Sequence, residues 1–310
     1  MKNTLVYWLH TLSPTHVGTG RGLGYIDLPI HRDCLTNWPA IPATAFKGVW
    51  ADSFSATDEK RKTDNSLRAA FGVATDGDNE SRAGALIPTD ARLVCLPVRS
   101  FRGTFAWCTS HLALEFLRRD LDMAGFTGLP EGIPPLAAGV ALHSPECVLK
   151  HSSGAAGAAK IFLADLDFEA KASEPAGKWA AFIAGHVFTE DTWKKAFTQR
   201  FAIIPDDAFN FLCETATEIA ARVRIDDKTG TVADGALWNE ELLPPESIFS
   251  GLISCDRVYG TAEGQTPVKL VKQFATDPLE LQIGGKASTG RGQVRCVFSQ
   301  PQGVRHDADK

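Results

Sequence analysis

The sequence predicts an α+β fold, with strands near both ends of the chain and a mixture of helices and further strands between them. Residues 3–12 are rich in β-branched and aromatic side chains with partial alternation, which is typical of a strand. Residues 279–299 have the pattern of a strand, a glycine loop and a second strand. Residues 109–125 carry leucines along one helical stripe. No period of about 20 to 50 residues repeats, so we expect no repeat architecture.

Helices are expected at several places after the first strand. Residues 42–54 place apolar side chains at helical spacing after a proline. The stretch 109–125 has Thr or Ser available as its N-cap and a glycine as its C-terminal stop. Two further helices are predicted over 178–188 and 190–201, where short apolar runs are harder to assign.

Polar and glycine-rich segments mark an insertion and a hairpin. Residues 52–92 form a polar insertion, which contains a short helix around 66–71. Two extended segments joined by Asp-Asp-Lys-Thr-Gly predict a long β-hairpin over about 222–244. We therefore predict one decorated domain over 1–298, followed by a flexible tail over 299–310.

The composition is that of a soluble globular protein. With 310 residues, of which 44% are hydrophobic, the chain can bury a sizeable core. It has no run of about 18 apolar residues, and its first residues lack the apolar stretch of a signal peptide, so we expect a cytoplasmic protein without a membrane partner. A net charge of −5 argues against a surface that coats nucleic acid everywhere, but it allows one basic groove.

The seven cysteines are scattered and lack a Cys-x-x-Cys motif, which fits reduced, buried thiols better than a disulfide framework. Cys108 with His111, and His143 with Cys147, have metal-like spacing. A tetrahedral zinc site would form if the two pairs met. The spacing matches no strong motif, so unrelated core cysteines and histidines are the favoured interpretation.

Two glycine-rich loops are the candidate binding elements. The loop within 16–33 lacks the Gly-x-Gly-x-x-Gly order of a dinucleotide-binding fold. The loop at 284–292 is not a P-loop, because it lacks the final Gly-Lys-Ser/Thr and is followed by a predicted strand instead of a helix. Without Cβ atoms, backbone N–H groups can form a concave nest for phosphate oxygens, so two such loops suggest a polyanion. Glycine-rich turns without a ligand are the alternative. The candidates in these loops are Gly18, Gly20, Arg21, Gly284, Gly285, Lys286, Thr289, Gly290 and Arg291.

Four cations are candidates for one basic groove: Arg21, Lys47, Lys286 and Arg291. Lys47 lies near a predicted helix N-terminus, where donor groups converge, and we expect it to bind phosphate. Each of the four side chains is also long enough to be a solvated surface residue.

Several of these segments resemble a known family. HVGTGRGLGYIDLPIHRD (16–33), WPAIPATAFKGVWAD (38–52) and QIGGKASTGRGQV (282–294) resemble the RAMP superfamily of CRISPR proteins, in particular the backbone subunit of the type III-B (Cmr) effector complex. RSFRGTFAWCTS (99–110) and VRIDDKTGTVADGALWNEELLP (223–244) resemble it as well, so the likeness spans most of the chain.

The resemblance implies a ferredoxin-like core, related to the RNA recognition motif, with helical insertions. It also implies identical copies stacked in a filament along a guide RNA, beside other Cmr-type subunits, with the loop at 284–292 on the RNA backbone. The hairpin over about 222–244 would be a thumb that displaces guide and target nucleotides at regular intervals. A duplex held by its backbone is read for shape, while base pairing carries the sequence.

Asp27 is a single carboxylate between apolar neighbours, directly after the first glycine loop. The resemblance implies that it cleaves complementary target RNA with a divalent metal ion such as Mg²⁺ and no organic cofactor. Such an ion would stabilise the charge that develops when a splayed nucleotide's 2′-hydroxyl attacks the next phosphate. On the sequence alone a structural role is favoured, in which Asp27 caps the loop or pairs with Arg21 or Arg32. His16 and His31 are of a type that transfers protons, but neither is assigned a catalytic role.

Two other functions remain open from the sequence. The chain could be a guide-binding scaffold in a complex whose RNA-cutting component is another subunit. It could instead resemble the RAMP endonucleases that process guide RNA without metal and typically use histidine, although no second C-terminal ferredoxin-like signature is recognisable. A metabolic enzyme is disfavoured, because the sequence has no nucleophile elbow, Walker motif or strong metal cluster.

Overall fold

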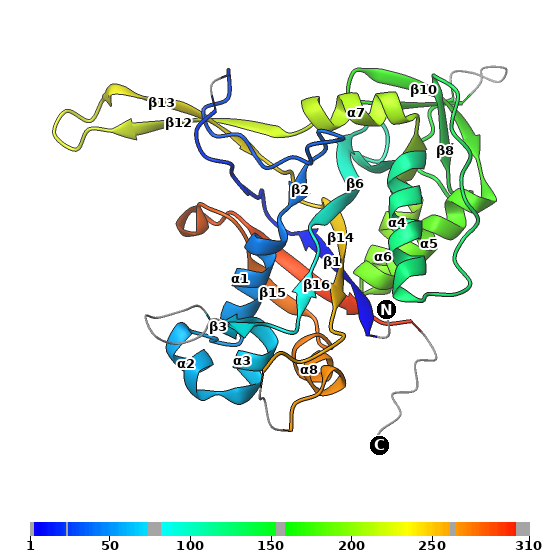
Figure 1. The fold of residues 1–310 in the computed structure, drawn as a ribbon. Coiled ribbons are helices and arrows are strands. Elements are labelled where there is room, and N and C mark those ends of the chain that lie inside the picture. Colours follow the sequence, from blue (N-terminus) through cyan, green and yellow to red (C-terminus); the bar gives the residue numbers. More distant parts are fainter. Residues whose placement is uncertain (1–2, 23, 74–81, 153–158, 261–263, 302–310) are drawn as a thin grey trace.

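A computed structural model describes residues 3–22, 24–73, 82–152, 159–260 and 264–301. The strands in these ranges are β1 (Thr4–Thr11), β2 (Ala40–Ile41), β3 (Gly72–Val73), β4 (Arg82–Ala83), β5 (Ile87–Pro88), β6 (Ala91–Arg99), β7 (Phe105–Ser110), β8 (Val140–His143), β9 (Lys160–Leu163), β10 (Leu166–Ala172), β11 (Phe201–Ile204), β12 (Glu218–Ile225), β13 (Val232–Leu242), β14 (Ile248–Ser254), β15 (Leu279–Gln282) and β16 (Gln293–Ser299). Twelve of these strands form one sheet, ordered β15-β16-β1-β14-β6-β7-β11-β8-β10-β9, with β2 beside β6 and β5 beside β14 (Figure 1).

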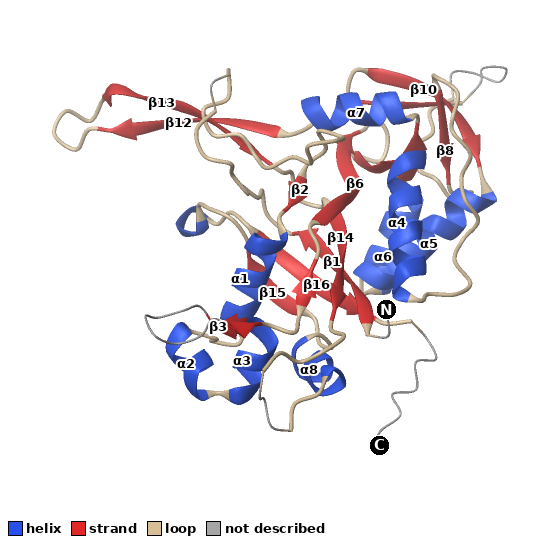
Figure 2. Cartoon of the chain, in the orientation of Figure 1, coloured by secondary structure: helices blue, strands red, loops and turns tan. Residues whose placement is uncertain are grey.

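Helices cover this sheet in two groups (Figure 2). One group packs beside the strands from β6 to β10, and the other lies around β15 and the polar insertion. The helices of the described residues are α1 (Ala43–Ser53), α2 (Asp58–Thr63), α3 (Asn65–Phe71), α4 (His111–Ala124), α5 (Glu174–Val187), α6 (Asp191–Arg200), α7 (Asp206–Thr215), α8 (Pro267–Phe274) and the short 3₁₀ helix η1 (Ala287–Thr289).

Strand β1 separates two hydrophobic cores. β14 and β16 flank it in antiparallel register, and all of its side chains are buried because both faces of the sheet are covered. On one face, Tyr7 stacks on Phe46 of α1, with ring centroids 4.2 Å apart. On the other face, Trp8 belongs to a second cluster, together with Trp179 of α5. Alternation along the strand therefore divides its apolar residues between the two cores.

The helix ends follow the capping signals in the sequence. Ser110 Oγ accepts the N–H of Ala113 at 3.3 Å and caps α4, while Gly125 ends that helix with a left-handed φ of 89°. The four helices expected over 42–54, 109–125, 178–188 and 190–201 correspond to α1, α4, α5 and α6. Helices α2, α7 and α8 were not predicted, because helices this short show too few turns of apolar periodicity. Helix α8 does carry a local signal, since Thr266 caps it and Pro267 is its first residue.

The predicted hairpin is formed by β12 and β13, which project from the body of the molecule (Figure 1). Asp226 Oδ1 accepts the N–H groups of Lys228 and Thr229 at 2.9 and 3.0 Å, so the expected turn residues do close the tip. The paired strands run from 218 to 242 and therefore start and end before the predicted limits of 222 and 244.

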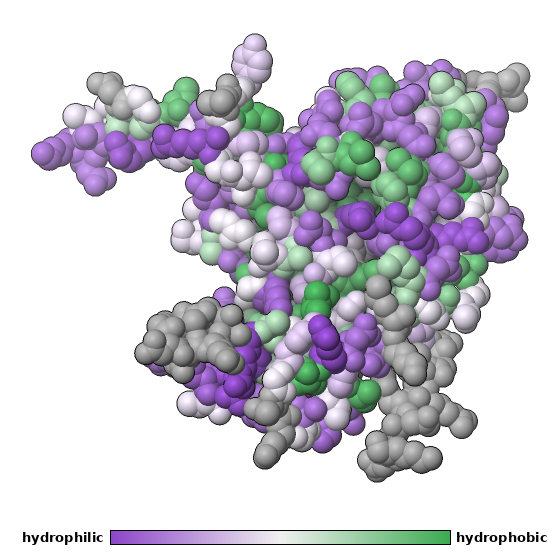
Figure 3. All heavy atoms as spheres, viewed as in Figure 1, coloured by the Kyte–Doolittle hydropathy of each residue, from purple (hydrophilic) through white to green (hydrophobic). Residues whose placement is uncertain are grey.

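The two faces of this hairpin differ. Ile219 and Val223 lie on one face and are about half exposed, at 49% and 46%. Arg222 lies on the other face, opposite Trp238 of β13. Much of the hairpin surface in Figure 3 is hydrophilic, which is typical of an arm that stays in contact with water or a polar ligand.

The polar insertion over 52–92 contains α2, α3 and the small β3–β4 pair. The helix expected around 66–71 is α3, which Asp64 caps by accepting the N–H groups of Ser66 and Leu67. Residues 74–81 of the insertion, and residues 302–310 of the predicted tail, lie outside the described residues.

Candidate functional site

The two glycine-rich loops lie against each other. The N–H of Gly285 donates to the carbonyl of His16 at 2.9 Å, and the N–H of Gly292 donates to the carbonyl of Pro14 at 3.0 Å. Gly284 has a φ of 83°, and a Cβ there would overlap the carbonyl oxygen of His16. Glycine is therefore required at this position, because a side chain would separate the loops.

The first loop forms a long turn whose tip carries Asp27. The N–H of Thr19 donates to the carbonyl of Pro29 at 3.3 Å, and the N–H of Gly22 donates to the carbonyl of Asp27 at 2.9 Å. Gly18 and Gly20 are exposed in this turn, and Gly20 has a φ of 97°. The glycines thus allow the chain to reverse and present Asp27 at the surface.

Asp27 is held by the base of the hairpin. Its Oδ2 accepts the backbone N–H of Asn239 on β13 at 2.7 Å, and the N–H of Leu28 donates to the carbonyl of Asn239 at 3.1 Å. Within the described part of the chain, Oδ1 of Asp27 has no hydrogen-bond partner and the carboxylate forms no ion pair. One oxygen is therefore oriented by the protein, while the other is available to a ligand.

Glu240, the next residue on β13, holds two cations at the same place. Glu240 is 2% exposed. Its carboxylate accepts a hydrogen bond from Trp238 Nε1 at 2.8 Å and forms ion pairs with Lys286 Nζ at 2.7 Å and Arg222 Nε at 3.5 Å. Burial would raise the pKa of Glu240, but the hydrogen bonds from Lys286 and Trp238 and the charges of Lys286 and Arg222 hold that pKa below its ordinary value. The carboxylate therefore stays ionised and fixes the Lys286 ammonium.

A cavity of about 380 Å³ lies between the Asp27 loop, β13 and Lys286. It brings together Arg21, Asp27 and Lys286, which are three of the residues singled out in the sequence, and its wall includes Leu237 and Trp238. The site is open, and it places Arg21 and Lys286 around the partly unpaired carboxylate of Asp27, with Glu240 holding Lys286 in position. This arrangement suits a ligand that is anionic along its length, such as a phosphodiester backbone.

Other predicted residues lie around this cavity or away from it. Thr289 and Gly290 are exposed on the second loop, at η1. Arg291 is less available than expected, since its guanidinium pairs with Glu218 at 3.7 Å. Lys47 is half buried in α1 and does not line the cavity. Burial, and then the nearby charge of Arg61, lower the pKa of Lys47.

Three residues that the sequence did not single out complete the site: Trp238, Asn239 and Glu240. The alternation of side chains along a strand predicts that Trp238 and Glu240 lie on one face of β13. The sequence does not predict that they lie near Asp27, because Asp27 and Asn239 are 212 residues apart in the chain.

A second buried carboxylate braces the segment after Asp27. Glu241 Oε1 accepts Arg32 Nη2 at 2.5 Å and Thr217 Oγ1 at 3.0 Å, and its Oε2 accepts the N–H of Ile30 at 3.1 Å. The suggested pairing of Asp27 with Arg32 is therefore wrong, because Glu241 occupies that guanidinium. His16 also lies here, and its Nδ1 donates to the carbonyl of Glu241 at 2.8 Å.

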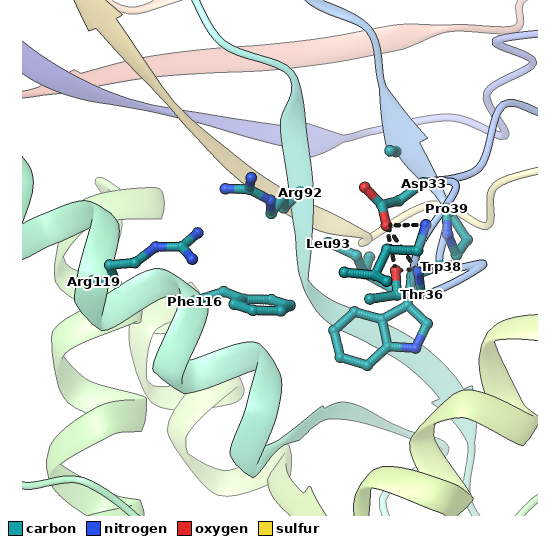
Figure 4. A pocket seen from close by; sticks show the side chains of 10 residues that line it. Asp33, Thr36, Trp38, Pro39, Arg92, Leu93, Phe116 and Arg119 are labelled. Carbon is teal, nitrogen blue, oxygen red and sulfur yellow. Dashed lines mark hydrogen bonds between the residues drawn. The ribbon is translucent and has the colours of Figure 1, made fainter.

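A separate cavity of about 120 Å³ lies between the 33–40 turn, β6 and α4 (Figure 4). The guanidinium carbons of Arg92 and Arg119 lie 5.8 and 5.2 Å from the ring centroid of Phe116. Asp120 accepts hydrogen bonds from both arginines, at 3.0 and 3.4 Å, so their charges are already paired. None of the residues predicted from the sequence lines this cavity.

The two metal-like pairs are part of the packed interior. Cys108 and His143 are almost fully buried, and His143 Nδ1 donates to the carbonyl of Ser144 at 2.7 Å. His111 Nδ1 donates instead to the carbonyl of Ile133. No group of three or more potential metal ligands gathers anywhere in the described ranges, so the two pairs do not meet.

The fold and the site define a class of protein. Residues 8–295 match the model of the RAMP superfamily, so the chain belongs to this family. Within it, the chain is 33% identical over 294 residues to the CRISPR system Cmr endoribonuclease Cmr4 of Pyrococcus furiosus, and the match covers 94% of each chain.

Solved structures agree with this assignment. The crystal structure of oligomeric Cmr4 from Pyrococcus furiosus superposes with a TM-score of 0.72 and 25% identity, covering 96% of this chain and 99% of that one. A cryo-EM structure of a type III-B Cmr-beta complex bound to cognate target RNA contains a chain with the same fold, at a TM-score of 0.67 and 19% identity, with 95% and 96% covered.

The likeness to the Cmr subunit that the motifs indicated is therefore confirmed, and the chain is a homologue of Cmr4. The α+β fold class with helical insertions and a projecting hairpin is also confirmed, and a ferredoxin-like core is consistent with the match. No described helix has the length and apolar character needed to cross a membrane. The roles of the individual site residues stay predictions.

Proposed function

We propose that this chain is the guide-RNA-binding backbone subunit of a type III CRISPR effector complex in the cytoplasm. In this proposal, copies of the chain form a filament with other Cmr-type subunits and cleave complementary target RNA at regular intervals, using Asp27 and a divalent metal ion. The likeness to Cmr4, which is named an endoribonuclease, supports the reaction class. The likeness to an oligomeric Cmr4 and to an RNA-bound Cmr-beta complex supports the assembly.

One observation carries the proposal: the carboxylate of Asp27 shares an open cavity with Arg21 and Lys286. The cations would neutralise phosphates on either side of the scissile bond. The backbone N–H of Asn239 fixes Oδ2 at 2.7 Å, so the carboxylate would meet the RNA in one orientation without reorganising.

Guide RNA would be held by the second glycine loop. Its residues Gly284, Gly285, Thr289 and Gly290 are exposed, and the loop is anchored to the first loop through Gly285 and Gly292. An exposed backbone with few side chains lets phosphate oxygens approach closely, and Lys286 adds charge. This binding is independent of base identity, as the reading of a guide by base pairing requires.

The residues present fit a magnesium ion that is shared with RNA. Mg²⁺ keeps several waters and is commonly held by one or two carboxylates together with substrate phosphates. Asp27 offers one carboxylate oxygen, whereas Glu240 is fully engaged by Lys286, Trp238 and Arg222. The ion would supply charge stabilisation at the reacting phosphate. Asp27 would be its protein ligand.

The protein's part in the reaction is then positioning. The hairpin would splay a nucleotide out of the guide–target duplex, so that its 2′-oxygen lines up with the adjacent phosphorus. The 2′-hydroxyl would lose its proton to solvent as its oxygen bonds to phosphorus, and the bond from phosphorus to the 5′-oxygen would break. The 5′-oxygen would take a proton from solvent, which leaves a 2′,3′-cyclic phosphate and a 5′-hydroxyl. Lys286 would balance the negative charge that grows on the phosphate oxygens during this step.

The proposal is tested with the assembled complex on end-labelled complementary RNA, in Mg²⁺ or in EDTA. We expect regularly spaced cuts with wild type in Mg²⁺, no cuts in EDTA, and no cuts with Asp27→Ala while the RNA stays bound. Asp122→Ala, which changes an exposed carboxylate on α4, is the matched control and should cut normally. If Asp27→Ala cuts as well as wild type, Asp27 is not catalytic, and the chain is a guide-binding scaffold in a complex that cuts RNA with another subunit. Cleavage of precursor guide RNA in EDTA would favour guide processing.

A further inference from the structure

The most exposed large hydrophobic side chain in the described part of the molecule belongs to the loop that carries Asp27. Tyr25 is 99% exposed, two residues before Asp27, at the tip of the first glycine loop. Leaving an aromatic ring of this size in water forgoes the burial that normally stabilises it. Within the described residues, Tyr25 has no ring contact. Trp238, in the cavity wall, is by contrast occupied by Lys286, whose Nζ lies 5.9 Å from the ring centroid, and by Glu240.

The position of Tyr25 is tied to that of Asp27. Asn239 donates its backbone N–H to Asp27 Oδ2 at 2.7 Å and its side-chain Nδ2 to the carbonyl of Tyr25 at 3.4 Å. Both residues are therefore fastened to one residue of β13. A Cβ at Gly22 would overlap the carbonyl oxygen of Ile26, so the turn from Gly22 to Ile26 is tightly folded. The backbone of Tyr25 is consequently held close to Asp27, while its ring projects into solvent.

The cavity that Asp27 lines, two residues after Tyr25, has a wall that suits a nucleotide. Leu237 is 66% exposed on the neighbouring strand and forms part of the cavity wall. The cations Arg21 and Lys286 lie in the same cavity and suit phosphates. A nucleotide that enters with its phosphate toward these cations would leave its base beside the apolar rim.

We propose that Tyr25 is a positioning residue that stacks on the base of the target nucleotide next to the bond cleaved at Asp27. This inference rests on the proposed function. A nucleotide splayed from the duplex loses its neighbouring bases, and the aromatic ring replaces one of them. Stacking tolerates any base because every base has a π-face, so Tyr25 would hold the nucleotide without adding sequence preference.

The test uses the assembled complex with guide RNA and target RNAs that carry 2-aminopurine at successive positions across one cleavage interval. Wild type, Tyr25→Ala and Tyr25→Phe are compared, with Phe101→Ala, which removes another exposed aromatic ring, as the control. At one position in each interval, fluorescence should be quenched in wild type and Tyr25→Phe and should increase in Tyr25→Ala. Cleavage by Tyr25→Ala should slow about ten- to a hundredfold.

An abasic target nucleotide separates stacking from a structural effect. With an abasic site at the quenched position, wild type and Tyr25→Ala should cut at the same rate, because no base is left to stack. Equal fluorescence and equal cleavage of normal RNA by Tyr25→Ala would overturn the inference and leave the proposed function intact. A slower Tyr25→Ala on abasic RNA would also overturn it. Failure of the wild-type complex to bind target RNA would overturn the proposed function and this inference together.

Discussion

The backbone N–H of Asn239 donates a 2.7 Å hydrogen bond to the carboxylate of Asp27, across 212 residues of sequence. This bond joins the glycine loop near the N-terminus to the base of the projecting hairpin. The same strand residue fixes Leu28, and the next two residues, Glu240 and Glu241, hold Lys286 and Arg32. The hairpin therefore organises the site at its base while its tip extends away from the body.

Lys286 is expected to contribute one phosphate contact. Lys286→Ala should weaken RNA binding for all sequences alike and reduce the slope of log K against log salt by about one, because one fewer counterion is released. Binding measured at several salt concentrations checks this. Lys195→Ala, on the exposed side of α6, is the control. An unchanged slope with Lys286→Ala would show that its pairing with Glu240 is purely structural.

Two adjacent glycines should respond differently to alanine. Gly284→Ala combines a left-handed backbone, which costs about 1–2 kcal/mol for a side-chain residue, with overlap on the carbonyl of His16. Gly285 does not have a positive φ, and a Cβ there would make ordinary contact with the His16 ring. Thermal unfolding and RNA binding should therefore deteriorate only in Gly284→Ala. Equal behaviour of the two variants would contradict the close packing of the loops.

Arg32→Ala should destabilise the chain by about 3 kcal/mol, since it leaves the buried carboxylate of Glu241 without its cation. Urea unfolding measures the loss. Arg32→Ala combined with Glu241→Gln should recover part of the stability, because no unpaired charge then remains buried. A double variant as unstable as the sum of the single changes would show that the two residues act independently.

Acid should destabilise the fold partly through His143. Burial, which outweighs the hydrogen bond to Ser144, lowers the pKa of His143, and the charge of Lys150 lowers it further. His143 therefore binds a proton more readily in the unfolded chain than in the folded one. Its contribution to the free energy of unfolding is fully present above about pH 6.5, the pKa of an unfolded histidine, and is lost as the pH falls from there toward the lower pKa of the folded state.

The measurement for this prediction is the free energy of unfolding between pH 7.5 and 5. One such group contributes a slope of up to about 1.4 kcal/mol per pH unit. His143→Asn should have a shallower slope than wild type, whatever its absolute stability. An identical slope would assign the acid sensitivity to other groups, such as His186, whose pKa burial also lowers.

Local signals in the sequence predicted local structure well. The Ser110 cap and the Gly125 stop mark the ends of α4, and the Asp226 turn marks the hairpin, because each depends on residues a few positions apart. The cavity was only partly predictable. Arg21, Asp27 and Lys286 were singled out one by one, but Glu240 and Asn239 carry no local signal, and their roles depend on a contact between distant segments.

Lys47 and Arg291 were predicted to bind RNA from their charge and segment alone, and the fold places neither of them in the cavity wall. Each is a cation in a suitable segment, yet Lys47 is half buried in α1 away from the cavity, and Arg291 pairs with Glu218. Lys286 is paired as well, with Glu240 at 2.7 Å, but its side chain lines the cavity beside Asp27, whereas neither Lys47 nor Arg291 does. The position of such a partner is a property of the fold.

The most direct measurement compares wild type with Asp27→Asn in the assembled complex, with target-RNA affinity and single-turnover cleavage followed in the same samples. The amide keeps the size of Asp27 and can still accept the N–H of Asn239, but it lacks the charge. We predict an affinity within about threefold of wild type and a cleavage rate at least about a hundredfold lower. A cleavage rate equal to wild type would contradict this prediction and assign the chemistry to another component.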